Sequence, residues 1–185
     1  MIVLDTPIAG LHLVRTETRH DQRGAFTRLF CEQELAPLLG ERRIVQINHS
    51  RTTRCGAVRG LHFQRAPWAE MKFVRCLAGR VWDVAVDLRE NSPTFLRWHA
   101  QELSPETGLT MAIPEGFAHG FQALTADSEL LYLHTAPYRP DFEGGLRHDD
   151  PRLAISWPEI PTDVSDRDRS HPLIGEDARS PRLSS

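Results

Sequence analysis

The chain has 185 residues, a length that suits a single globular domain. Hydrophobic residues make up 40% of the sequence and charged residues 25%, values that argue against a disordered, collagen-like or coiled-coil protein. The formal net charge of -3 provides no basic field that would attract a nucleic acid, so no nucleic-acid partner is expected.

The predicted elements begin, in chain order, with a short helix over residues 32–39. Strands follow over residues 60–64, 81–88 and 129–135, where side chains alternate between two faces in the pattern of half-buried strands. Ser165 and Asp168 have the spacing of an N-cap and the third residue of a short helical turn. Residues 175–185 are polar, so we expect a flexible tail after one domain at residues 1–174.

Glycine and proline residues separate these segments along the whole chain. Many short strands joined by frequent turns are typical of β-sandwiches, jelly rolls and barrels. The expected fold class is therefore all-β, with a few short helices.

The expected localisation follows from the cysteines and the N-terminus. Cys31, Cys55 and Cys76 are odd in number and form no CxxC motif, so neither a disulfide framework nor a zinc knot is expected. The N-terminus has no basic region and Asp5 interrupts its apolar start, which argues against a signal peptide. No apolar run approaches membrane-spanning length. We therefore expect a cytoplasmic protein that does not bind a membrane.

Five polar side chains lie on strand faces where the alternation would otherwise place core residues: His62, Lys72, Asp83, His119 and Tyr132. One such residue alone is commonly a satisfied buried group, whereas five in a compact all-β chain favour a polar cavity. Lys72 is the only lysine among 22 lysine and arginine residues. A lysine retained against this arginine bias suggests a need for a compact ammonium group.

The segment at residues 114–119 reads P-x-G-x-x-H and matches the second motif of cupin barrels. The first cupin motif normally supplies two histidines and a glutamate to a metal. Here Gln64 replaces the second histidine, and Lys72 stands about where the glutamate would be. Because an ammonium group repels a cation, we expect a cupin-like jelly-roll barrel whose polar pocket holds no metal.

Longer blocks carry a more specific resemblance. They read R-G-L-H at residues 59–62 and P-E-G-F-A-H-G-F at residues 114–121, and further matching segments run in order over roughly residues 3–172. In these blocks the chain resembles the dTDP-4-dehydrorhamnose 3,5-epimerase family. The resemblance implies a homodimeric isomerase that needs no cofactor. Its substrate would be a small-molecule nucleotide sugar, a dTDP-linked 4-keto-6-deoxyhexose that is inverted at C3 and C5.

The resemblance also implies four catalytic residues. His62 matches the base that removes a proton beside the ketone, and Asp168 matches the carboxylate that orients it. Lys72 fits a donor to the enolate oxygen, and Tyr132 matches the acid that delivers a proton to the opposite face. We add Asp83 as a residue that holds Lys72 charged and in position, with a purely structural ion pair as the equal alternative.

Further residues resemble the family's substrate contacts. Those at the diphosphate or sugar are Arg23, Arg59, Arg167 and His119, and those at the nucleotide are Gln46, Asn48, Tyr138 and Glu143, with Tyr138 stacking on the base. Three positions depart from the family pattern: Arg28 replaces a glutamate, Glu70 a glutamine and His148 a tryptophan. We count Arg28 among the substrate-binding residues and expect Arg28 and Glu70 to affect which sugar or nucleotide is accepted.

Four alternatives remain open from the sequence. Two are enzymes on a similar sugar nucleotide, an epimerase that inverts C3 alone and a 3,4-ketoisomerase. The third is a sugar-nucleotide-binding cupin without activity, which the joint presence of a base and an acid argues against. The fourth is a metal-dependent cupin enzyme, which Gln64 and Lys72 argue against. The sugar, the number of inverted centres and the pathway are left undetermined by the motifs.

Overall fold

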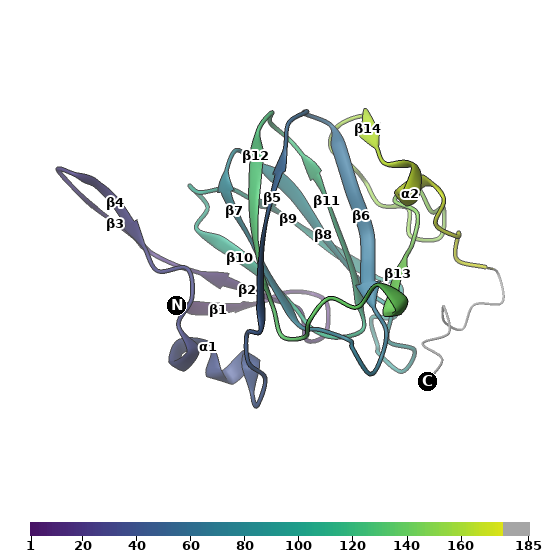
Figure 1. Cartoon of the computed structure of the whole chain (residues 1–185), viewed down its shortest axis with the longest axis horizontal. Coiled ribbons are helices and arrows are strands. Elements are labelled where there is room, and N and C mark those ends of the chain that lie inside the picture. Colours follow the sequence, from purple (N-terminus) through teal and green to yellow (C-terminus); the bar gives the residue numbers. More distant parts are fainter. Residues whose placement is uncertain (176–185) are drawn as a thin grey trace.

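Two six-stranded sheets face each other in the computed structural model, which describes residues 1–175 (Figure 1). The first sheet contains, in spatial order, β1 (Ile2–Asp5), β2 (His12–Arg15), β10 (Leu109–Ile113), β7 (Lys72–Ala78), β12 (Ser128–His134) and β5 (Gln46–Thr52). The second contains β13 (Glu143–Gly145), β6 (Ala57–Gln64), β11 (Phe117–Ala123), β8 (Val81–Asp87) and β9 (Trp98–Leu103), with β14 (Asp163–Val164) parallel to β6.

The main hydrophobic core fills the space between the two sheets. Val74 and Leu130 contribute from the first sheet, and Ala85 and Phe121 contribute from the second. This arrangement confirms the predicted all-β jelly roll. The strands of the sandwich belong to two separate sheets and do not close into a barrel, which leaves one end of the sandwich open for a cavity.

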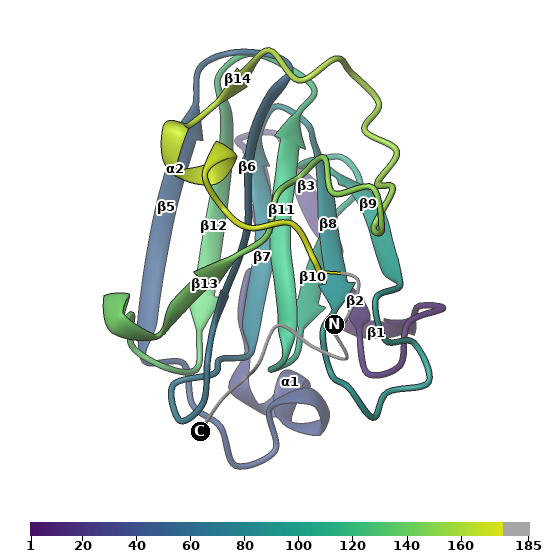
Figure 2. The same cartoon turned by 90° about the vertical axis from the view of Figure 1, so that its right-hand side faces the viewer.

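The outer faces of both sheets are also covered in part. Helix α1 (Glu32–Leu39) packs Leu35 and Leu39 against Phe73 on the first sheet. Figure 2 shows the chain after β14 crossing the outer face of the second sheet, where Leu153 and Ile174 are buried. Strand β8 is therefore buried on both faces, which corrects the half-buried pattern predicted from its alternation.

The predicted element boundaries agree closely with the structure. The helix has the expected bounds, and the strand expected at residues 129–135 is observed one residue earlier, at Ser128–His134. The short turn after Ser165 forms α2 (Asp166–Arg169). Apart from residue 175, the predicted tail lies outside the described residues. No helix within residues 1–175 is long and apolar enough to cross a membrane.

A hairpin near the N-terminus extends away from both sheets (Figure 1). It consists of β3 (Thr18–Asp21) and β4 (Gly24–Thr27), which pair only with each other. Phe26 on this hairpin is 71% exposed.

Candidate active site

A cavity of about 650 Å³ opens between the two sheets, within the range of small-molecule sites. The first sheet and the loop that leads into it supply polar side chains to the lining, among them Asn48, Ser50, Glu70, Lys72, Tyr132 and His134. From the second sheet and α2 come Arg59, His62, His119, Glu143, Arg167 and Asp168. All four predicted catalytic residues therefore line one cavity.

The alternation of the strands explains how these side chains reach the cavity. On β7, Phe73 packs under α1, whereas Lys72 and Val74 face the space between the sheets. On β12, Leu133 likewise packs outward and Tyr132 faces inward. The prediction that Lys72 points into the sandwich is confirmed.

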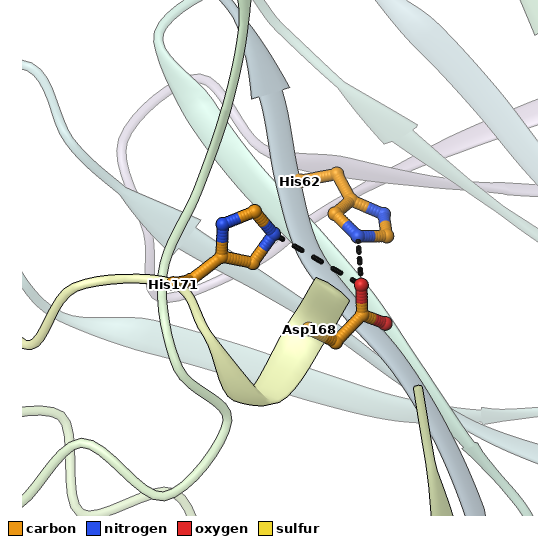
Figure 3. Close-up of side chains that lie close together, drawn as sticks. All are labelled: His62, Asp168 and His171. Carbon is orange, nitrogen blue, oxygen red and sulfur yellow. Dashed lines mark hydrogen bonds and ion pairs between the residues drawn. The ribbon is translucent and has the colours of Figure 1, made fainter. Parts of the chain in front are cut away.

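Asp168 fixes the orientation of His62 (Figure 3). Its Oδ1 lies 2.9 Å from His62 Nε2, and its Oδ2 accepts a hydrogen bond from the Gly60 backbone N–H at 3.0 Å. Burial opposes ionisation of this carboxyl, but the hydrogen bonds from His62 and Gly60 outweigh it and hold the pKa of Asp168 well below its usual range. The ionised carboxylate accepts the Nε2 proton of His62, so Nδ1 carries the free electron pair of a base.

The first turn of α2 positions Asp168. The Ser165 hydroxyl accepts a hydrogen bond from the Asp168 backbone N–H at 3.1 Å, which is the N-cap contact predicted from the sequence. Gly60 has φ of +117°, and a Cβ at this position would lie 2.6 Å from the Gly120 Cα. Glycine at residue 60 therefore lets β6 approach β11 next to His62 and leaves its N–H directed at Asp168.

His62, Asp168 and His171 offer three ligand atoms within 4.8 Å of one another, a spacing that can suit a metal ion (Figure 3). The Arg167 guanidinium, however, lies 3.1 Å from His62 Nε2 and 3.5 Å from Asp168 Oδ1. A fixed positive charge beside two of the three ligand atoms disfavours a cation and favours an anion. Gln64, at the cupin ligand position, donates to the carbonyls of Trp68 and Pro137 instead.

Lys72 is paired with Glu70, at 2.9 Å between Nζ and Oε1. Asp83 does not form the ion pair with Lys72 that we expected from the sequence: its Oδ1 lies 2.8 Å from His119 Nε2, and its buried Oδ2 has no hydrogen-bond partner among the described residues. Asp83 is fully buried, and this burial raises the pKa of its carboxyl against the opposing effect of His119. His119 and Asp83 thus form a second histidine–carboxylate pair in the cavity wall.

Tyr132 faces His62 from the other sheet, since β12 and β6 belong to opposite walls of the sandwich. Its hydroxyl accepts a hydrogen bond from Ser50 at 3.4 Å. Burial raises the pKa of the Tyr132 phenol well above its ordinary value, so the group stays protonated at neutral pH. The cavity therefore has a base on one wall and a proton donor on the other.

The remaining predicted contacts lie near the cavity mouth. Tyr138 is 50% exposed, and its hydroxyl donates to Glu143 at 2.9 Å. Glu143 also accepts from Arg167 at 3.2 Å. Gln46 does not line the cavity; it accepts from the Tyr138 backbone N–H at 2.9 Å and donates to Asn48 at 3.3 Å. Gln46 thus contacts Tyr138 and Asn48, which both line the cavity.

Two predicted substrate-binding residues lie away from the cavity of this chain. Arg23 stands at the turn of the β3–β4 hairpin, pairs with Asp21 and has a side chain that is 91% exposed. Arg28 follows the same hairpin and pairs with Glu34 of α1. Because the hairpin extends away from the sandwich (Figure 1), neither guanidinium reaches the cavity from within one chain.

Sequence reasoning missed the contacts of Glu70 and the presence of His134 in the site. His134 shares a strand face with Tyr132, so the alternation that places Tyr132 in the cavity also places His134 there. Its Nδ1 lies 2.8 Å from Glu70 Oε2. Glu70 stood out in the sequence only as a departure from the family pattern, and nothing in the local pattern pairs it with a residue 64 positions away.

Comparison with known proteins agrees with this geometry. The family model described as dTDP-4-dehydrorhamnose 3,5-epimerase matches residues 5–176. The chain is 44% identical to the dTDP-4-dehydrorhamnose 3,5-epimerase of Sinorhizobium fredii over 91% of this chain and 87% of that protein. It is 40% identical to the Salmonella typhimurium enzyme over 95% and 97% of the two chains. A Legionella pneumophila 3,5-epimerase, crystallised with dTDP-4-keto-L-rhamnose, superposes with a TM-score of 0.88 at 39% identity, over 93% and 92% of the chains.

Proposed function

The chain belongs to the dTDP-4-dehydrorhamnose 3,5-epimerase family, and we propose that its cavity inverts C3 and C5 of a dTDP-linked 4-keto-6-deoxyhexose. The observation that carries this proposal is the placement of a carboxylate-bound histidine on one wall and a protonated tyrosine on the other. An epimerase needs both groups, because inversion removes a proton from one face of a carbon and returns one to the opposite face.

Proton removal is assigned to His62. The ketone at C4 acidifies the protons on C3 and C5, so a base of near-neutral strength suffices to remove them. With its Nε2 proton directed at Asp168, His62 takes the substrate proton on Nδ1. The imidazolium that forms is stabilised by the Asp168 carboxylate, which remains ionised throughout.

The enolate is assigned to Lys72 and the returning proton to Tyr132. As carbanion character develops beside C4, negative charge moves onto the C4 oxygen, and a fixed ammonium in a buried site stabilises it more than water would. Lys72 is 7% exposed and uses one N–H for Glu70, which leaves two for this oxygen. Tyr132 then donates its phenolic proton to the face opposite His62.

The remaining cavity residues are proposed to hold the rest of the substrate. Arg59 and Arg167 present guanidinium groups suited to diphosphate oxygens. The half-exposed ring of Tyr138 offers a stacking surface for the base, beside the polar groups of Asn48 and Glu143. His119, held by Asp83, faces the sugar from the same wall as His62.

We place the protein in the cytoplasm as a homodimer, and the dimer explains the position of Arg23. A projecting hairpin with an exposed Phe26 suits contact with a second copy, in which Arg23 would reach the partner's cavity. Arg28 would enter the same contact. One dimer would then contain two equivalent sites, each completed by a hairpin from the other chain.

Solvent-deuterium exchange tests the proposed function. The purified protein is incubated in D₂O with dTDP-4-keto-6-deoxyglucose, and NMR follows deuterium at C3 and C5. We expect deuterium at both carbons and an epimerised product, and we expect His62→Asn to slow exchange by about 100- to 10,000-fold, the range for loss of a general base. His49→Asn, a change at an exposed histidine of β5, is the control and should exchange normally.

The outcomes separate the alternatives. Deuterium at C3 alone would indicate an epimerase that inverts one centre, and a product with its keto group moved to C3 would indicate a ketoisomerase. Unchanged exchange in a folded His62→Asn protein would contradict the assigned base. Binding of dTDP without exchange at either carbon would indicate a non-catalytic protein.

A further inference from the structure

A carboxylate–histidine pair lies beside Lys72 and has no part in the steps above. Glu70 and His134 are both buried, with side chains that are 8% and 10% exposed. Glu70 binds Lys72 through Oε1 and His134 through Oε2, at 2.9 and 2.8 Å. Both oxygens of one buried carboxylate are thus occupied by groups that line the cavity.

From this geometry we infer that Glu70 and His134 are positioning residues that hold the Lys72 ammonium in place for the enolate oxygen. The part that Lys72 plays in the reaction rests on the proposed function, whereas its attachment to Glu70 does not. A lysine side chain has four rotatable bonds, and a free ammonium would sample many positions in a cavity of this size. A charge-assisted hydrogen bond from a fixed carboxylate reduces that freedom.

Glu70 precedes β7 and lies outside the hydrogen-bonded ladder of the sheet. Its carboxylate therefore needs a second contact, besides Lys72, to fix its position. His134 provides it from the neighbouring strand, where its backbone pairs directly with that of Lys72. The two contacts oppose the effect of burial, which favours the neutral acid, and together they hold the pKa of Glu70 below its ordinary value. Glu70 is therefore ionised, and its negative charge can hold the Lys72 ammonium in place.

His134 is itself fixed from the opposite side. Its Nε2 lies 3.4 Å from the Asn48 amide nitrogen, so a ring that donates from Nδ1 to Glu70 can accept from Asn48 at Nε2. Asn48 accepts in turn from Gln46, which holds the backbone of Tyr138. A continuous row of hydrogen bonds therefore connects Lys72 with the residue proposed to stack on the nucleotide base.

Other charged groups near Lys72 do not replace Glu70 in this role. Asp83, on the opposite sheet, contacts His119 through Oδ1 and makes no ion pair with Lys72, although the Lys72 charge is near enough to oppose the rise in the pKa of Asp83. Tyr132, on the adjoining strand, is a neutral phenol whose hydroxyl is held by Ser50. Among residues 1–175, Glu70 is the one carboxylate within ion-pair distance of Lys72.

The sequence allows a direct measurement, because Lys72 is the only lysine in the chain. Protein labelled with ¹³C-lysine gives one side-chain spin system, whose relaxation reports the order of the Cε atom. We expect a high order parameter in the wild-type protein, a clear fall in Glu70→Ala, and a smaller fall in Glu70→Gln, whose side-chain oxygen can still accept from the ammonium. His134→Gln should give an intermediate value, since it loosens Glu70 without removing it.

A matched control lies on the same strand as His134, β12. Glu129 of β12 pairs with His49 of β5 at 3.1 Å, but on the exposed side of the sheet. Glu129→Gln removes an equivalent histidine–carboxylate pair and should leave the Lys72 signal unchanged. An unchanged order parameter in both folded Glu70 variants would overturn the inference. Because this measurement uses no substrate, it stands even if the proposed reaction is wrong.

Kinetics provides the second measurement. Glu70→Ala should lower kcat by about 10- to 100-fold, the scale of a misplaced catalytic group, with little change in KM. In a Lys72→Met background the same substitution should cause no further loss, because both changes act through one ammonium. An equal loss from Glu70→Ala in the presence and absence of Lys72 would show that Glu70 acts independently and would overturn the inference.

Discussion

The side chains of the cavity act in charged pairs, and each pair determines what one catalytic residue can do. Asp168 accepts from His62 Nε2 and leaves Nδ1 basic, and Asp83 contacts His119 Nε2, although burial raises the pKa of Asp83 whereas hydrogen bonds lower that of Asp168. Glu70 performs the corresponding task for an ammonium. Asp168 and Asp83 are buried and the side chain of Glu70 is 8% exposed, so the partners of all three carboxylates are held in orientation.

The compact charge of Lys72 is expected to be essential. Lys72→Arg keeps the positive charge but brings a planar guanidinium that is larger and aims its donors in other directions. We expect kcat to fall by about 100-fold or more, as for the loss of one donor to a developing oxyanion. Steady-state kinetics of the folded variant measures this fall, with Arg51→Lys on the exposed side of β5 as the control.

A near-normal rate in Lys72→Arg would show that Lys72 supplies only charge. It would also remove the need for the fixed ammonium position on which the role of Glu70 depends.

The four-residue helix α2 places the carboxylate of Asp168 beside His62. It has no apolar face of its own, and Asp168 is its buried residue. The helix is held by its N-cap at Ser165 and by the hydrogen bond that the Gly60 N–H of β6 donates to Asp168. A short capped turn thereby carries the carboxylate that orients the base.

Removal of the cap should affect both stability and catalysis. Ser165→Ala leaves the Asp168 N–H without its side-chain acceptor, which costs about 0.5–2 kcal/mol of unfolding free energy. We also expect a lower kcat, because the carboxylate loses its fixed approach to His62. Chemical denaturation and kinetics measure the two effects, and Ser165→Asn, which restores a capping oxygen, should recover both. Loss of stability with an unchanged kcat would mean that the cap does not position Asp168.

The elements also show what local sequence pattern can and cannot predict. The alternation placed Lys72 and Tyr132 inside the sandwich correctly, and the cap spacing predicted α2, because both depend on residues a few positions apart. The contact between Glu70 and His134 depends on the register of β7 against β12 and could not be predicted locally. The partner of Asp83 was missed for the same reason, since β8 and β11 bring it to His119.

The role of the projecting β3–β4 hairpin in the whole molecule is not explained by a single chain. It carries Arg23 away from the cavity to which the family resemblance assigns it. The sequence motif made Arg23 a candidate but contained no information on which copy of the chain it would serve. A dimer that exchanges hairpins reconciles the two observations.

Mixed dimers test this arrangement. Subunits with Arg23→Ala are combined with subunits with His62→Asn, after denaturation and refolding together. If Arg23 serves the partner's cavity, each mixed dimer has one cavity with both native residues, and activity below KM should rise above that of either variant alone. If Arg23 acts within its own chain, no cavity in the mixture is complete and no rise should occur.

We propose that the substrate loses protons to the sheet that carries His62 and receives protons from the sheet that carries Tyr132. The most direct test is Tyr132→Phe, which keeps the ring but removes the phenolic proton. In D₂O, NMR should show that His62-dependent exchange at C3 and C5 continues in this variant. The amount of epimerised product should fall sharply. The ratio of exchange to product should therefore rise far above the wild-type value. Normal product formation by the folded Tyr132→Phe protein would contradict the account.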